Sequence, residues 1–149
     1  MSKTMYDTIL LPTDGSDGIG AAARHAGTIA GRFDATVHVL SVVDTRNRFE
    51  SPSSGLSTDA WIEAERERAG TAIDATVAEL PDDVSVETTQ REGVPKTEIV
   101  DAVTEIPADL VVMGTHGRTG LDHYLIGSVA ETVVRESPVP VLTVQLSDE

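Results

Sequence analysis

The chain has 149 residues and no cysteine, and its 25 acidic residues against 11 basic ones give a formal net charge of −14 at pH 7. This composition excludes a disulfide framework and a cysteine-based zinc site, and the lack of a basic patch argues against nucleic acid as a partner. No apolar run reaches the roughly eighteen residues of a membrane span and no signal-peptide pattern opens the chain, so we expect no membrane partner and a cytoplasmic protein of one domain, residues 1–149.

The acidic excess also bears on the solvent in which the protein works. Only two of the basic residues are lysines, Lys3 and Lys96. Such a surface suits concentrated salt, where the Debye length falls to about 3 Å near 1 M and like-charge repulsion is screened. We therefore predict a halophilic protein, the alternative being an ordinary acidic, solvated surface.

The N-terminal part of the chain predicts a strand followed by a helix. Residues 6–11 form a short apolar strand that Pro12 ends, and residues 13–16 form a turn rich in side-chain hydrogen-bond acceptors. Residues 19–33 then place small apolar side chains on one helical face, which predicts close packing on a sheet.

The next region predicts two strands separated by a loop and a long helix. Residues 36–43 are largely β-branched and apolar, as in a strand covered on both faces, and residues 44–57 form a polar loop. A helix begins at Thr58 and ends before Pro81. Residues 84–90 alternate, with Val84, Val86 and Thr88 on one face and polar side chains on the other, which indicates an edge strand with one wet face. The side chains expected to face inward from the helix region are Trp61, Ala69, Ala72, Ile73, Val77 and Leu80.

A third helix and a fourth strand follow. Pro95 suits the first turn of a helix, Pro107 closes it, and Val94 stands where a capping Asp or Asn is usual, so we expect weak capping. Its apolar stripe consists of Ile99, Val103 and Ile106. Residues 110–113 then give an apolar strand, and residues 139–145 give the last one.

Between these last two strands lies a glycine loop that opens a helix. Gly114 and Gly117 follow the strand at once, and Gly127 and Ser128 precede a helix with apolar residues at Ala130, Val133 and Val134. Glycines let the backbone approach an anion and adopt positive φ, and a helix N-terminus supplies unpaired N–H donors. This order predicts a phosphate site.

A structural explanation of the same residues competes with this one. Gly114 and Gly117 could be turn glycines, and Ser128 with Glu131 spells a capping box, which needs no ligand. The full pattern is more specific than a glycine loop, because G-x2-G-x9-G-S resembles the nucleotide-binding signature of the universal stress protein family. The resemblance extends over nearly the whole chain, through residues 9–16, 37–44, 92–95 and 137–142.

Alternating strands and helices predict a parallel α/β sheet with right-handed crossovers. The resemblance implies a single doubly wound, five-stranded sheet in the order 3-2-1-4-5, with helices on both faces. In such sheets ligands bind outside the carboxyl ends of the strands at the point where the order reverses. That point lies between residues 12–16 and residues 114–127.

The resemblance also implies the ligand, which is ATP, with AMP as an alternative. The segment 114–129 would hold the phosphates, and Arg118 could reach a terminal phosphate or be a solvated loop residue. Pro12, Thr13 and Asp14 would border the ribose and base, Val42 would offer backbone groups to the adenine, and Asp14 could orient Mg²⁺ through water. The candidate cofactor-binding residues are Pro12, Thr13, Asp14, Val42, Gly114, His116, Gly117, Arg118, Gly127, Ser128 and Val129.

Other constellations are weaker. Residues 18–23 fit the dinucleotide fingerprint loosely but lie too far beyond the first strand, no P-loop G-K-S or G-K-T occurs, and the four histidines lack metal-ligand spacing. We expect a nucleotide-binding regulatory module of the stress response. The alternatives are a slow ATP-hydrolysing enzyme, for which no catalytic residue is assignable, and a family member that binds no nucleotide and acts through protein interactions. The apolar edge strand over 139–145 predicts a homodimer.

Overall fold

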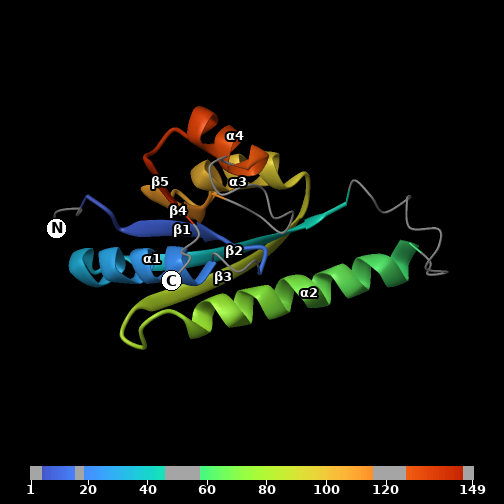
Figure 1. Ribbon diagram of the computed structural model, residues 1–149, viewed down its shortest axis with the longest axis horizontal. Coiled ribbons are helices and arrows are strands. Elements are labelled where there is room, and N and C mark those ends of the chain that lie inside the picture. The colour runs from blue at the N-terminus through green and yellow to red at the C-terminus, as the bar shows by residue number, and fades with distance from the viewer. Residues whose placement is uncertain (1–4, 16–18, 46–57, 116–126, 146–149) are drawn as a thin grey trace.

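The computed structural model describes residues 5–15, 19–45, 58–115 and 127–145, and Figure 1 shows the path of the chain. Strands and helices alternate throughout. The strands are β1 (Thr8–Pro12), β2 (Thr36–Asp44), β3 (Ser85–Gly93), β4 (Leu110–Gly114) and β5 (Val141–Val144). The helices are α1 (Ile19–Phe33), α2 (Thr58–Ala78), α3 (Pro95–Glu105) and α4 (Ser128–Glu136).

The five strands form one parallel sheet in the order β3-β2-β1-β4-β5, which confirms the expected doubly wound topology. The central strands β1 and β4 pair through Ile9 with Leu110 and Leu10 with Val111. The crossovers from β1 and β2 put α1 and α2 on one face of the sheet, and those from β3 and β4 put α3 and α4 on the other. The order therefore reverses between β1 and β4, as predicted.

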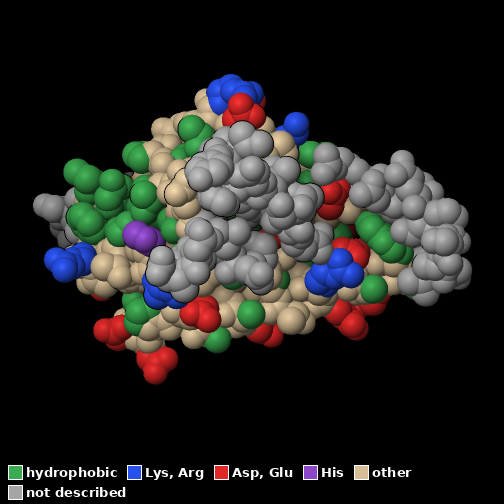
Figure 2. Space-filling view, in the orientation of Figure 1, with side chains coloured by type: hydrophobic (Ala, Val, Ile, Leu, Met, Phe, Trp, Pro, Cys, Tyr) green, Lys and Arg blue, Asp and Glu red, His purple; other side chains and the backbone are tan. Residues whose placement is uncertain are grey.

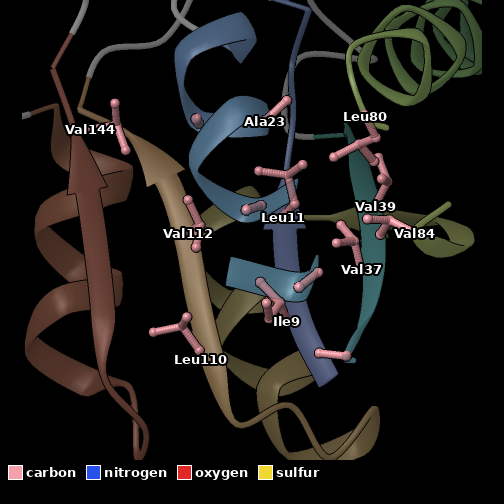
Figure 3. Packing of buried hydrophobic residues seen from close by; sticks show 14 of the residues in the cluster. Ile9, Leu11, Ala23, Val37, Val39, Leu80, Val84, Leu110, Val112 and Val144 are labelled. Carbon is pink, nitrogen blue, oxygen red and sulfur yellow. The ribbon is translucent and has the colours of Figure 1, made fainter. Parts of the chain in front are cut away.

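Alternate side chains of the central strands fill two separate cores. Ile9 and Leu11 point toward α1 and α2, whereas Leu10 points toward α3 and α4, and all three are fully buried. Figure 3 shows the first core, in which strand side chains meet Ala23 of α1 and Leu80 beyond α2. Burial of one such aliphatic side chain stabilises the fold by about 1.5–3 kcal/mol. The α1 residues on this face are small, namely Ala22, Ala23, Ala26, Gly27 and Ala30, so the helix lies close to the sheet.

Asp109 fastens the amino ends of the two central strands. Its carboxylate Oδ2 accepts hydrogen bonds from the backbone N–H groups of Asp7 and Thr8, at 2.9 and 3.1 Å. The N–H of Asp109 in turn donates to the carbonyl of Thr8 at 2.8 Å. A side chain thus replaces ladder hydrogen bonds where the strands begin, and this fixes the relative heights of β1 and β4.

Several local expectations need correction. Strand β1 begins at Thr8 instead of residue 6, and β3 extends to Gly93 instead of residue 90. Val134 of α4, predicted to be part of the apolar face, is 48% exposed, whereas Val133 is fully buried. The last strand begins at Val141 instead of residue 139, since Pro140 has no N–H to contribute to a ladder. Thr88 of β3, expected on the covered face, is exposed. The weak cap of α3 is confirmed, because Val94 is its N-cap and makes no side-chain cap hydrogen bond.

Candidate functional site

The turn after β1 is fixed by hydrogen bonds at the carboxyl edge of the sheet. Pro12 ends the strand, and the N–H of Thr13 donates to the carbonyl of Leu40 in β2 at 2.8 Å. The N–H of Gly15 donates to Thr13 Oγ1 at 3.1 Å. Gly15 has φ of 80°, a conformation that favours glycine. Asp14, between these two anchored residues, is exposed.

A second anchored pair lies where β4 ends and α4 begins. Gly114 is the last residue of β4, and the N–H of Thr115 donates to the carbonyl of Val144 at 3.1 Å. The N–H of Gly127 donates to the carbonyl of Thr115 at 2.6 Å. Thr115 and Gly127, the two residues that flank the segment over 116–126, are therefore hydrogen-bonded to each other. Of the predicted site residues, His116, Gly117 and Arg118 lie outside the described residues.

The start of α4 does not form the capping box that competed with the phosphate explanation. Gly127, not Ser128, is the N-cap, and it makes no side-chain cap hydrogen bond. Ser128 is an exposed first-turn residue, next to the half-buried Val129. A helix start of this kind leaves first-turn N–H groups for a ligand or water, with the positive end of the helix dipole behind them.

One reason given for glycine at position 127 is wrong. Gly127 has φ of −67° and ψ of 159°, an extended conformation that any residue adopts, so positive φ does not explain it. Gly127 is buried, and its N–H is used by Thr115. The remaining physical reason for a glycine is its lack of a side chain, which lets a buried backbone approach a neighbouring group closely.

Val42 approaches the same edge from β2. It is half-buried two residues before the strand ends, and its side chain packs against the core beneath α3 and α4. Just beyond the end of β2, the N–H of Thr45 donates to the carbonyl of Gly93 at 3.3 Å. Because the carboxyl ends of parallel strands share one edge of the sheet, Val42 lies near the same edge as Pro12 and Gly114. Its backbone is thus at the rim of the crevice.

A different polar cluster lies at the opposite, amino end of the strands. It borders a hollow of about 360 Å³, lined by Thr8, Thr36, His38, Glu87, Glu105, Ile106 and Pro107. Burial lowers the pKa of His38, and Glu87 partly opposes this by raising it. Arg91 of β3 pairs with two carboxylates of α3, Glu98 at 2.9 Å and Glu105 at 2.7 Å. These hydrogen bonds raise the pKa of Arg91. Within the described ranges, no group of three or more His, Cys, Asp or Glu side chains could hold a metal ion.

Sequence reasoning missed Thr76, a polar residue that touches the candidate site. Its side chain is fully buried on α2, and its Oγ1 lies 2.9 Å from Thr13 Oγ1. The available signal was its position, because Thr76 falls on the apolar stripe of α2 with Ala69, Ala72 and Ile73. A hydroxyl on an otherwise apolar stripe must find a partner when it is buried.

The chain resembles known proteins over nearly its full length. A family model described as the universal stress protein family matches residues 5–145. Universal stress protein MJ0531 of Methanocaldococcus jannaschii is 41% identical over 145 residues, covering 96% of this chain and 84% of that protein. Among solved structures, that of MJ0577 has a TM-score of 0.83 at 30% identity, covering 97% of this chain and 99% of that one. A universal stress protein in complex with cAMP has a TM-score of 0.62 at 27% identity, covering 95% and 98%.

The fold defines a doubly wound α/β protein, a class whose ligands bind at the switch point, here between β1 and β4. The family model and the similar proteins define the chain more narrowly than its fold class does. The chain belongs to the universal stress protein family. In the part of the chain that the structure describes, no helix is long and apolar enough to cross a membrane.

Proposed function

We propose that this chain is a cytoplasmic, adenine-nucleotide-binding regulatory protein whose ligand is ATP, with AMP as the alternative. The observation that carries the proposal is the start of α4, whose N-cap Gly127 has no side chain to satisfy the first-turn N–H groups and donates its own N–H to the carbonyl of Thr115. A related protein, 27% identical, is described in complex with cAMP, which is itself an adenine nucleotide. Both observations support an adenine nucleotide in the crevice.

In this proposal each part of the rim has a separate task. The segment 114–129 binds phosphates through backbone N–H groups, Ser128 and Val129 act at the helix start, and Arg118 contacts the terminal phosphate. Pro12, Thr13 and Asp14 border the ribose and base, and Val42 offers backbone groups to the adenine. Mg²⁺, where present, is held mainly by the phosphates, with Asp14 acting through water.

Calorimetry with ATP, AMP and cAMP, each with and without Mg²⁺, tests the proposal. Gly127→Val should abolish ATP binding, because an isopropyl group fills the space in front of the helix start. Gly31→Val is the matched control, since Gly31 is exposed on α1 and a Cβ there meets nothing within 4 Å. Gly127→Ala gives a smaller step if the valine variant folds poorly. Equal ATP affinity in the Gly127 variants and the parent would place the ligand elsewhere.

The enzymatic alternative makes a different prediction for the same samples. The described part of the site offers backbone donors and one exposed carboxylate, Asp14, but no assigned group that activates water. ATP should therefore be hydrolysed very slowly or not at all. Turnover above about 1 s⁻¹, the low end of ordinary enzyme rates, and lost in Gly127→Val, would favour the enzyme. Absence of binding by all three nucleotides would favour a member that acts through protein interactions alone.

A further inference from the structure

A buried hydroxyl on α2 contacts the turn that borders the proposed nucleotide site. Thr76 has no exposed surface and Thr13 is 7% exposed, so neither hydroxyl can rely on bulk water. Their Oγ1 atoms are 2.9 Å apart, and Thr76 Oγ1 is also 2.8 Å from the carbonyl oxygen of Ala72. This contact joins residues 63 positions apart in the chain.

The donors and acceptors fix the direction of this chain of hydrogen bonds. Each hydroxyl has a single proton, and the carbonyl of Ala72 can only accept. All groups are satisfied when Thr76 donates to Ala72, Thr13 donates to Thr76, and the N–H of Gly15 donates to Thr13 Oγ1. The rotamer of Thr13, and with it the hydrogen bond that closes the turn at Gly15, then depends on Thr76.

The turn also touches α2 at a second point, one helical turn from Thr76. A Cβ on Gly15 would lie 3.2 Å from Cβ of Ala72, so the backbone of Gly15 is in close contact with the helix. Two neighbouring positions of α2 therefore hold the turn, one by contact and the other by hydrogen bonding. Asp14 lies between the two residues that are held.

We propose that Thr76 is a positioning residue of the nucleotide site. Its hydroxyl fixes Thr13 and so keeps the Thr13–Gly15 turn, and the Asp14 within it, in the conformation that meets the ligand. The inference rests on the proposed function for its effect on binding, but its effect on the turn itself can be measured without nucleotide. Removal of the hydroxyl leaves the Thr13 hydroxyl buried without its acceptor, and the turn escapes this cost by moving.

The test compares three variants by two measurements. Thr76→Val keeps the shape and β-branching but removes the hydroxyl, Thr76→Ser keeps the hydroxyl, and Thr71→Val makes the same change at an exposed site on α2. In nucleotide-free protein, Thr76→Val should speed solvent exchange of the Gly15 amide, followed by NMR, roughly tenfold. It should also weaken ATP binding roughly tenfold, or about 1.4 kcal/mol. Thr76→Ser keeps the hydroxyl and Thr71→Val changes an exposed residue, so each should stay within about twofold of the parent in both measurements, against the tenfold change that about 1.4 kcal/mol represents.

The outcomes separate the two proposals. An unchanged Gly15 exchange rate in Thr76→Val overturns the positioning role, whatever happens to the unfolding midpoint. A Thr76→Ser variant as defective as Thr76→Val also overturns it, because packing and not the hydroxyl would then matter. If the parent binds no adenine nucleotide, the proposed function fails, and Gly15 exchange alone decides whether Thr76 holds the turn.

Discussion

His38 is an imidazole buried between the outer strand of the sheet and the end of α3. Its Nε2 lies 2.6 Å from Thr89 Oγ1, and its Nδ1 lies 3.7 Å from Glu87 Oε1. Burial lowers the pKa of His38 because the charged form loses water, and Glu87 acts against this by stabilising the imidazolium. Glu87 is exposed, so solvent weakens its influence and burial has the larger effect.

NMR titration should accordingly place the pKa of His38 below about 6.5, the value for an unperturbed histidine. Glu87→Gln should lower this pKa further, since it removes the raising charge. As pH falls below about 6.5 the unfolded chain binds a proton more readily than the folded one, so His38 makes the protein less stable toward acid.

Glu136→Gln is the control, because it removes an equal charge from α4, on the other side of the sheet centre. His38→Gln should remove the loss of stability that His38 contributes as the pH falls below about 6.5, the unperturbed value. A pKa at or above the unperturbed value in the parent, or an increase in Glu87→Gln, would contradict this account.

Single residues also mark the limit of what the sequence could predict. The turn at Thr13 and the helix start at Gly127 were placed correctly, because glycine, proline and hydroxyl residues act on the backbone next to them. Thr76 and Asp109 were not assigned, because their partners lie 63 and about 100 positions away and only the folded chain brings them together. The φ of Gly127 was mistaken, since a glycine can be required for space alone.

At the scale of elements, the connection from β3 to α3 depends on one glycine. Gly93 has φ of 146°, which L side chains rarely adopt. A Cβ there would lie 2.7 Å from Glu98 Oε2, and Glu98 is the carboxylate that pairs with Arg91 at 2.9 Å. A side chain at this position would strain the backbone and displace the ion pair that joins the strand to the helix.

Gly93→Ala should therefore lower the free energy of unfolding by about 1–3 kcal/mol, the usual cost of a residue held in a sparsely populated conformation. Gly31→Ala is the matched control. Gly31 lies within α1 with open space around it, so alanine should stabilise the protein there by about 0.5–1 kcal/mol. Urea unfolding measures both, and a Gly93→Ala variant as stable as the parent would refute the strain.

The spacing of apolar residues in the sequence predicted the order and type of the elements. It did not predict how side chains pack at the two borders of the sheet. Apolar spacing located all four helices and five strands within the described residues, because each must bury one face or both. Val134 is exposed because α4 lies over β5, the last strand on this side of the sheet. Beyond β5 there is no further strand on which a second apolar side of the helix could pack. The exposure of Thr88 has the same cause on the other border strand, which α2 contacts less than it contacts β2.

For the whole molecule, negative charge dominates the surface. Figure 2 shows acidic side chains along the lower border, where Figure 1 places α2, and the net charge is −14. Several arginines are already used in ion pairs, such as Arg66 with Glu92 at 2.6 Å and Arg135 with Glu131 at 3.2 Å. Most of these pairs are exposed and worth little, so the repulsion among the remaining carboxylates stays largely uncompensated.

The midpoint of thermal unfolding should consequently rise between about 0.1 M and about 2 M KCl, as screening removes that repulsion. The control is the same pair of measurements near pH 4.5, the isoelectric point of the sequence, where the net charge vanishes and the gain from salt should shrink. A midpoint that is unchanged or lower in high salt at pH 7 would refute the halophilic prediction.

The two borders of the sheet differ in a way that predicts association through β5. The outer border strand β3 carries exposed polar side chains, whereas β5 is short and apolar, with half-buried Val141 and Leu142. The exposed Val134 lies on the neighbouring α4. An apolar strand at a border invites pairing with another strand, and the same strand of a second copy would satisfy its backbone groups about a two-fold axis.

The register of β5 provides a variant aimed at this pairing alone. The carbonyls of Pro140 and Val144 accept hydrogen bonds from the β4 side. Because successive residues of a strand turn their backbone groups to opposite sides, the N–H of Thr143 points away from β4. Thr143→Pro therefore removes a donor from the outer border without breaking a bond to β4, and Thr143→Ala is the control for loss of the side chain.

Sedimentation velocity in high salt at micromolar concentration should show the parent and Thr143→Ala as dimers and Thr143→Pro as a monomer. High salt is required because two chains of net charge −14 repel each other strongly when unscreened. The competing explanation is that the acidic tail over residues 147–149, outside the described residues, covers the border and keeps the chain monomeric. A parent that sediments at monomer mass, with or without ATP, would favour the tail, and a dimer that survives in Thr143→Pro would place the interface on another surface.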